Sequence, residues 1–182
     1  KTDMPKSIID NKTAKKLYKA INATPHGPVR FIDGMSDVPE TSTNLGIVKS
    51  DNGKIVVANL IRSSAETAKH QLKDDMSGLF KLAGAKVKAH GEYPGWKPNF
   101  DSPILEAMKN TYNNKYGKIP EVKIIHAGLE CGVLGATYPN WDMISFGPTI
   151  RFPHSPDEKV NIKTVGMFWD FLVETLKNVP EK

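Results

Sequence analysis

The sequence predicts an α/β protein in two parts: an α+β first half with a helix-backed antiparallel sheet, and a second half that forms part of an α/β domain. The first half follows the order helix, strand, hairpin, helix, strand, which gives an antiparallel sheet covered by helices. The second half follows the order helix, strand, strand, helix, and its strands are largely apolar, as in sheets covered on both faces. Between the halves the sequence becomes rich in proline and aromatic residues. We place the domain boundary there, with residues 1–94 in one domain and 95–182 in the other.

The first elements are a helix and a hairpin. Residues 10–21 have helical spacing, with polar N-cap candidates at the start and Pro25 just beyond the end. A strand is predicted at 28–35. Residues 41–64 contain two alternating or apolar runs around Asn52-Gly53, a dipeptide that accepts the positive φ angles of a tight turn. This hairpin is the strongest local pattern in the chain.

A second helix and a strand complete the first half. Apolar residues recur at helical spacing over 64–82, and Gly84 is placed to end that helix. A strand is expected at 85–93.

The second half contains two helices and two apolar runs. Ser102 and Pro103 are suited to the N-cap and first turn of a helix that ends before Gly117. Strands are predicted at 121–129 and 143–150. The last helix is expected over about 162–178.

Composition limits the classes of function. Lysine and arginine total 25 against 20 acidic residues, and the isoelectric point is near 9.2. The basic residues are dispersed and do not alternate with aromatic residues, so a nucleic-acid partner is disfavoured. No apolar run is long enough to span a bilayer, and the first residues lack the apolar core of a secretory signal. We therefore expect a cytoplasmic protein with no membrane partner. A single cysteine, Cys131, excludes an internal disulfide, and a buried structural thiol is favoured over a nucleophile.

Histidines are the candidate metal ligands. None of the five lies in an HExxH or HxD arrangement, so spacing alone shows no complete metal site. His154 follows a predicted strand and is flanked by prolines, in the kind of loop where α/β sheets bind ligands. On the residues alone, an exposed loop histidine remains the favoured interpretation. His126 and Glu130 also follow a predicted strand, where structural hydrogen bonds to backbone are an equal alternative.

The hairpin carries candidates for substrate recognition. Arg62 ends its second strand, and a guanidinium group binds a carboxylate through two hydrogen bonds. Asn44, on the partner strand, could donate its amide to the same ligand. A surface salt bridge for Arg62 and a turn cap for Asn44 are the commoner roles of such residues.

Four segments in collinear order then carry a family resemblance: ETSTNLGIV, EYPGWKP, IIHAGLECG and DMISFGPTIRFPHSPDE. Together they resemble the C-terminal portion of the aminoacyl-histidine dipeptidases, also called Xaa-His dipeptidases or bacterial carnosinases. These are di-zinc metallopeptidases of the aminoacylase-like superfamily. The resemblance extends from about residue 25 to 180. It implies a catalytic α/β domain with two zinc ions, and an inserted lid domain that closes over the dipeptide and contributes to a homodimer.

By this resemblance residues 1–94 are the second part of the lid, and residues 95–182 are the C-terminal part of the catalytic domain. The histidine of the HSPDE motif is a zinc ligand in the family, which implies that role for His154. Arg62 corresponds to a lid arginine that binds the substrate carboxylate, with Asn44 as a further contact. Gly147 and Thr149 resemble the loop that lines the substrate pocket, and Glu130 is placed near the amino end of the substrate or the metal shell.

Other family residues have no match in this sequence. The HxD ligand pair, the bridging aspartate, the Glu-Glu pair with the general base, a further acidic ligand and the lid histidine are all absent from it. We expect the 182 residues alone to be inactive and to require a missing N-terminal part of the same protein. The alternative is a binding or dimerisation module without catalysis, in which His154 holds no metal.

Overall fold

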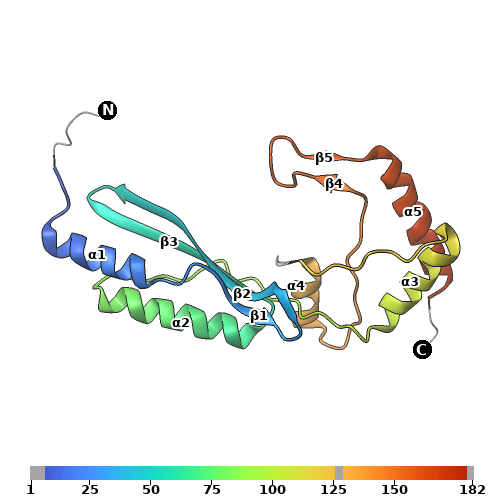
Figure 1. Ribbon diagram of the computed structural model, residues 1–182, viewed down its shortest axis with the longest axis horizontal. Helices are drawn as coiled ribbons and strands as arrows, with labels where there is room; N and C mark the ends of the chain where they lie inside the picture. The colour runs from blue at the N-terminus through green and yellow to red at the C-terminus, as the bar shows by residue number, and fades with distance from the viewer. Residues whose placement is uncertain (1–6, 126–128, 180–182) are drawn as a thin grey trace. The chain divides into compact units, whose positions relative to one another are not determined.

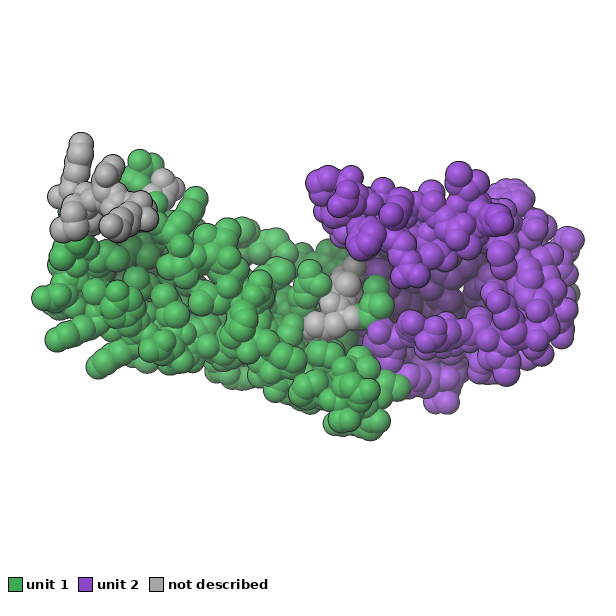
Figure 2. Space-filling view, turned by 45° about the horizontal axis from the view of Figure 1, so that its top comes forward, with its two compact units in different colours: residues 1–95, 125–128 green, residues 96–124, 129–182 purple. Residues whose placement is uncertain are grey.

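The computed structural model describes residues 7–125 and 129–179, and it divides into two compact units (Figures 1 and 2). Unit 1 comprises residues 1–95 and 125–128, and unit 2 comprises residues 96–124 and 129–182. Each unit is described separately below. No helix among the described residues is long and apolar enough to cross a membrane.

Unit 1 contains an antiparallel sheet in the order β1-β2-β3, which confirms the predicted hairpin (Figure 1). Its strands are β1 (Gly27–Ile32), β2 (Met35–Asp51) and β3 (Lys54–Ser63). Asn52 and Gly53 at the β2–β3 turn have φ angles of 47° and 72°, the two positive values of a type I′ turn. This turn sets the register that pairs Ser42 with Arg62 and Asn44 with Leu60.

Two helices accompany this sheet: α1 (Asn11–Ala23) and α2 (Glu66–Leu82). The Asp10 carboxylate caps α1 by accepting from the backbone N–H groups of Lys12 and Thr13, each at 3.0 Å. α2 ends in a Schellman motif at Gly84, whose φ is 87°: the N–H groups of residues 84 and 85 donate to the carbonyls of residues 81 and 80. Both helix ends were predicted from these residue types.

The core of unit 1 combines apolar and hydroxyl side chains. Leu72 and Met76 on α2 are buried, as are Thr41 and Thr43 on β2. The Thr43 hydroxyl donates to the Met76 sulfur at 3.7 Å, so one face of the sheet is closed by α2. The opposite face carries the exposed residues of the alternating pattern on β3.

Unit 2 contains α3 (Pro103–Tyr116), α4 (Glu130–Thr137) and α5 (Ile162–Lys177), with a two-residue ladder between β4 (Ile150–Arg151) and β5 (Lys159–Val160). α3 begins where predicted, because the buried Ser102 hydroxyl accepts from the Leu105 N–H at 3.1 Å. α3 and α5 pack through Tyr112 and Phe171, whose rings meet edge to face with centroids 5.1 Å apart.

Three predicted strands were wrong. Residues 85–93 form no strand, and neither do the described residues of 121–129. Of 143–150, only Ile150 lies in a strand. Their sequences have the right composition, but a strand also needs a neighbour that accepts and donates backbone hydrogen bonds. Among the described residues no such neighbour lies beside them. The sequence also gave no indication of α4, whose eight residues include two glycines.

Candidate functional site

His154 lies in the loop that joins β4 to β5. The two strands pair Ile150 with Val160 and Arg151 with Lys159, and residues 152–158 connect them. Just outside the ladder, the Asn161 N–H donates to the Thr149 carbonyl at 2.9 Å. The imidazole therefore belongs to an exposed loop whose two ends are held together by backbone hydrogen bonds.

The loop contains two residues in the left-handed region that are not glycine. Phe152 has a φ of 54° and His154 a φ of 64°. Such backbone conformations cost about 1–3 kcal/mol each and persist only where surrounding contacts hold them. Strain of this kind concentrates at sites that bind or react, so the loop is the strongest candidate for function in unit 2.

Hydrogen bonds within the loop hold this conformation. The Ser155 carbonyl accepts from the Glu158 N–H at 3.1 Å, closing a turn with Pro156 at its second position, where the fixed φ of proline is favoured. The Ser155 hydroxyl accepts from the Asp157 N–H at 3.2 Å. The Glu158 side chain then returns along the loop, and its carboxylate accepts from the His154 N–H at 2.8 Å.

Thr149 and Gly147 precede the loop in unit 2. The Thr149 N–H donates to the Thr164 hydroxyl at 2.9 Å, which ties this approach to the first turn of α5. Gly147 is exposed, and a Cβ added there would meet no atom within 4 Å. Both lie on the segment that leads into β4 and His154, with open space beside Gly147.

Glu130 is the first residue of α4, and the strand predicted before it is not formed by the described residues. A carboxylate in a first helical turn is favoured by the helix dipole. Burial raises the pKa of the adjacent Cys131 thiol above its ordinary value of 9.0, and the Glu130 charge acts in the same direction. A thiol that stays protonated is a poor nucleophile, in keeping with the structural role predicted for Cys131. His126 lies outside the described residues.

In unit 1, the register brings Arg62 and Asn44 to the same face of the sheet. Arg62 pairs with Ser42, and Asn44 lies two residues further along the same strand, so Arg62 and Asn44 are diagonal neighbours. Both are exposed. This is the face opposite the one that α2 covers, and the two side chains are available to a ligand approaching it.

The described residues do not form a complete metal site. An imidazole such as that of His154 is a ligand that zinc accepts, and the constrained loop suits one. Among residues 7–125 and 129–179, however, no three histidine, cysteine, aspartate or glutamate side chains converge. The donor set therefore fits one ligand of a zinc site whose other ligands lie outside these residues.

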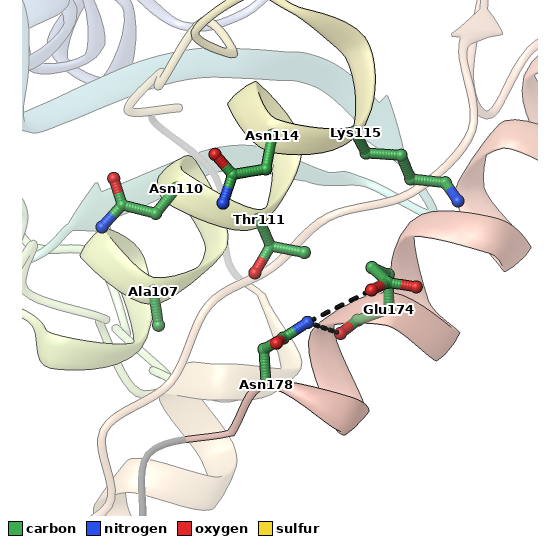
Figure 3. A pocket seen from close by; sticks show the side chains of 7 residues that line it. All are labelled: Ala107, Asn110, Thr111, Asn114, Lys115, Glu174 and Asn178. Atoms are coloured by element: carbon green, nitrogen blue, oxygen red, sulfur yellow. Dashed lines mark hydrogen bonds between the residues drawn. The ribbon is translucent and has the colours of Figure 1, made fainter.

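A separate pocket of about 450 Å³ lies between α3 and α5 (Figure 3). Its lining is polar and includes Asn110, Asn114 and Glu174, and the Asn178 amide donates to the Glu174 backbone carbonyl at 2.7 Å. None of the residues predicted to bind metal or substrate lines this pocket. The pocket and the His154 loop are therefore distinct features of unit 2.

Comparison with known proteins places the chain among dipeptidases. It is 43% identical over 177 residues to the cytosol non-specific dipeptidase of Escherichia coli, which is 97% of this chain and 36% of that protein. The crystal structure of aminoacylhistidine dipeptidase from Vibrio alginolyticus matches all of the chain with a TM-score of 0.84 and 42% identity. The resemblance predicted from the motifs is confirmed.

The match covers only part of each relative. The chain spans about a third of the length of these dipeptidases, 36% of the first and 37% of the second. Aminopeptidase PepT from Bacillus cereus matches 92% of the chain and 45% of its own length, with a TM-score of 0.70 and 20% identity, which indicates a shared fold. A scan against protein-family models found no match.

Proposed function

We propose that the chain is the C-terminal part of a zinc-dependent dipeptidase that hydrolyses Xaa-His dipeptides such as carnosine. The observation that carries the proposal is the identity of more than 40% to two dipeptidases across almost the whole chain. The strained HSPDE loop adds independent support, because backbone strain of this kind is retained where it serves a site.

His154 is proposed as a zinc ligand. Zinc supplies a water molecule made acidic enough to attack the peptide carbonyl near neutral pH. In the proposed enzyme two zinc ions are held jointly by His154 and by residues of the missing N-terminal part, which also provides the general base. The 182 residues alone would then be inactive, since one imidazole cannot hold a catalytic zinc that needs about three protein ligands.

The remaining candidates are proposed to bind substrate. Arg62 would bind the carboxylate of the dipeptide through its guanidinium group, with Asn44 on the same face of the sheet donating an amide hydrogen bond. Gly147 and Thr149 would line the pocket ahead of His154, and Glu130 would meet the amino end of the substrate. In this assignment unit 1 is part of the lid and unit 2 is part of the catalytic domain of a cytoplasmic homodimer.

The exposed surface supports a larger parent. The chain exposes 14,155 Å², whereas two separate compact domains of half its mass would together expose about 10,500 Å². The excess does not depend on how the two units are arranged, because the comparison treats them as separate bodies. Further protein that covers this surface is the simplest physical account of it.

The test is hydrolysis of carnosine, with zinc present, by the longest form of the protein that contains this chain. We expect activity in that form, a loss of at least about a hundredfold on His154→Ala, and no activity from the 182 residues alone. His90→Ala, which removes an exposed histidine of unit 1, is the matched control. Full activity of the His154→Ala variant would refute the proposed role of this residue.

One observation favours the alternative of a binding or dimerisation module. The sheet face that carries Arg62 also exposes Ile47 by 50%, Val56 by 38% and Leu60 by 53%. An apolar sheet face of this kind is a recognised site of association. Size-exclusion chromatography with zinc titration distinguishes the two functions: tight self-association of the longest form without zinc affinity or hydrolysis would support the module.

A further inference from the structure

We propose that Glu158 is a positioning residue for His154, holding the histidine backbone in the left-handed conformation from which the imidazole is presented. The inference rests on the proposed function in that His154 acts at the site. It goes beyond that function by assigning a role to a residue with no predicted part in binding or chemistry. Its basis is the hydrogen bond of 2.8 Å from the His154 N–H to the Glu158 carboxylate.

The loop sequence explains how Glu158 reaches His154. Ser155 and Pro156 begin a turn that closes when the Glu158 N–H donates to the Ser155 carbonyl at 3.1 Å. The turn reverses the chain and brings residue 158 back beside residue 154. A glutamate at this position has a side chain long enough to return to the backbone of His154, and its carboxylate is a stronger acceptor than a neutral group.

The conformation of His154 explains why such a bond is needed. At a φ of 64° the Cβ of a residue other than glycine is crowded by its own backbone, so the residue relaxes to a negative φ unless contacts prevent it. Relaxation would rotate the His154 N–H away from the carboxylate and turn the imidazole in a new direction. Of the two left-handed residues, Phe152 has a separate contact: the Lys159 ammonium lies 5.3 Å from its ring centroid.

Asp157 provides a matched control. It lies next to Glu158 and carries the same charge, and its carboxylate makes no hydrogen bond with the described residues. Asp157→Ala therefore removes one negative charge from the loop while the bond to His154 stays in place. Glu158→Gln removes the charge but keeps an oxygen that accepts the bond, so it serves as the conservative variant.

The first test needs no metal and uses the 182-residue chain. Amide hydrogen exchange at His154 is measured by NMR in the parent chain and in the three variants. We expect Glu158→Ala to exchange roughly two- to tenfold faster at His154, as the net strength of one hydrogen bond dictates. Glu158→Gln should lie between the two and Asp157→Ala should be unchanged. Equal exchange rates in Glu158→Ala and the parent would overturn the proposal.

The second test uses the longest zinc-loaded form of the protein. Glu158→Ala should lower zinc affinity and kcat by roughly tenfold, with partial recovery in Glu158→Gln and no change in Asp157→Ala. Unchanged zinc affinity and kcat in Glu158→Ala would overturn the positioning role even if amide exchange at His154 becomes faster. If His154→Ala itself leaves hydrolysis intact, the proposed function fails instead, which separates the two failures.

Discussion

The two units differ in how their extended segments are stabilised. In unit 1, β1, β2 and β3 are consecutive in sequence, and each pairs with the strand next to it in the chain. In unit 2 the only ladder among the described residues is the two-residue pairing of β4 with β5, and residues 118–125 and 138–149 contain no strand or helix. Unit 1 is a sheet closed by a helix, whereas unit 2 is a helix pair with extended segments beside it.

This difference shows that local sequence is enough for a hairpin and not for a sheet of distant strands. A hairpin supplies both partners through a short turn, so its hydrogen bonds require little loop closure. The apolar runs of unit 2 resemble buried strands but have no partner nearby in the chain. The core follows the same division, because the few buried apolar side chains of unit 2 lie on α3 and α5.

The largest expected effects come from one core residue in each unit. Leu72→Ala should lower the free energy of unfolding of unit 1 by about 2–5 kcal/mol, and Phe171→Ala that of unit 2 by about 3–5 kcal/mol, because each leaves a cavity in its own core. Amide hydrogen exchange, followed separately in α2 and α5, measures both. The exposed Leu82 and Leu176 provide alanine controls on the same helices. Equal loss of protection in both units from either variant would show that the units unfold as one.

A glycine substitution should have opposite effects in the two units. A Cβ on Gly95 would lie 2.5 Å from the Ser63 carbonyl oxygen and 2.9 Å from Ser64, so Gly95→Ala should destabilise unit 1 by about 1–3 kcal/mol. Gly166, inside α5, has open space, and Gly166→Ala should stabilise unit 2 by about 0.5–1 kcal/mol. Thermal unfolding of both variants tests the sign, and a higher Tm for Gly95→Ala would contradict the close backbone approach.

A smaller effect is expected at the start of α3. The Asp142 carboxylate accepts from the Ser102 hydroxyl and from the Ile104 N–H, both at 2.9 Å, and so completes the cap of this helix. Asp142→Ala should cost about 1 kcal/mol and accelerate amide exchange in the first turn of α3, with unit 1 unaffected. Asp101→Ala removes a neighbouring exposed carboxylate and should change little. If the two variants behave alike, the cap contributes nothing measurable.

The smallest effect is a pH dependence at the end of unit 1. Burial acts to raise the pKa of Glu66, but hydrogen bonds from Lys69 and the Gly95 N–H outweigh it and lower the pKa below its ordinary value of 4.5. A depressed folded-state pKa contributes stability above pH 4.5 that is lost as pH falls through the lower folded value. Glu66→Gln should therefore reduce stability at pH 7 and have little effect in strong acid.

Denaturant unfolding of Glu66→Gln at several pH values measures this effect. Glu92→Gln removes an exposed charge from the same part of unit 1 and leaves the Gly95 hydrogen bond intact, so it serves as the control. A stability difference between Glu66→Gln and the parent that is constant down to strong acid would contradict the expected linkage.

What was predictable from sequence follows from the range of the interactions involved. The ends of α1, α2 and α3 depend on caps within a few residues, and Asp10, Gly84 and Ser102 identified them correctly. The Asn52-Gly53 turn is equally local. The strands expected at 85–93, 121–129 and 143–150 were wrong because pairing depends on partners that composition does not reveal. α4 was missed because its glycines weaken the helical pattern.

The candidate site shows the same division. His154 was identified from its motif, and the shared face of Arg62 and Asn44 follows once the hairpin register is known. Glu158 was not singled out, although a signal was present: serine and proline begin a turn that ends at a glutamate four residues after the histidine. The left-handed φ values at Phe152 and His154 carry no such signal, since neither residue type requires them.

The type I′ turn at the end of the β2–β3 hairpin has a consequence for the chemical ageing of the protein. Asparagine followed by glycine is prone to deamidation, because the unhindered glycine nitrogen can attack the asparagine side chain and form a cyclic imide. In the closed hairpin the backbone at Asn52 and Gly53 is held in the fixed angles of the turn, which restricts that attack. Deamidation at Asn52 during storage would therefore measure how often the end of the hairpin opens, and would do so without any label.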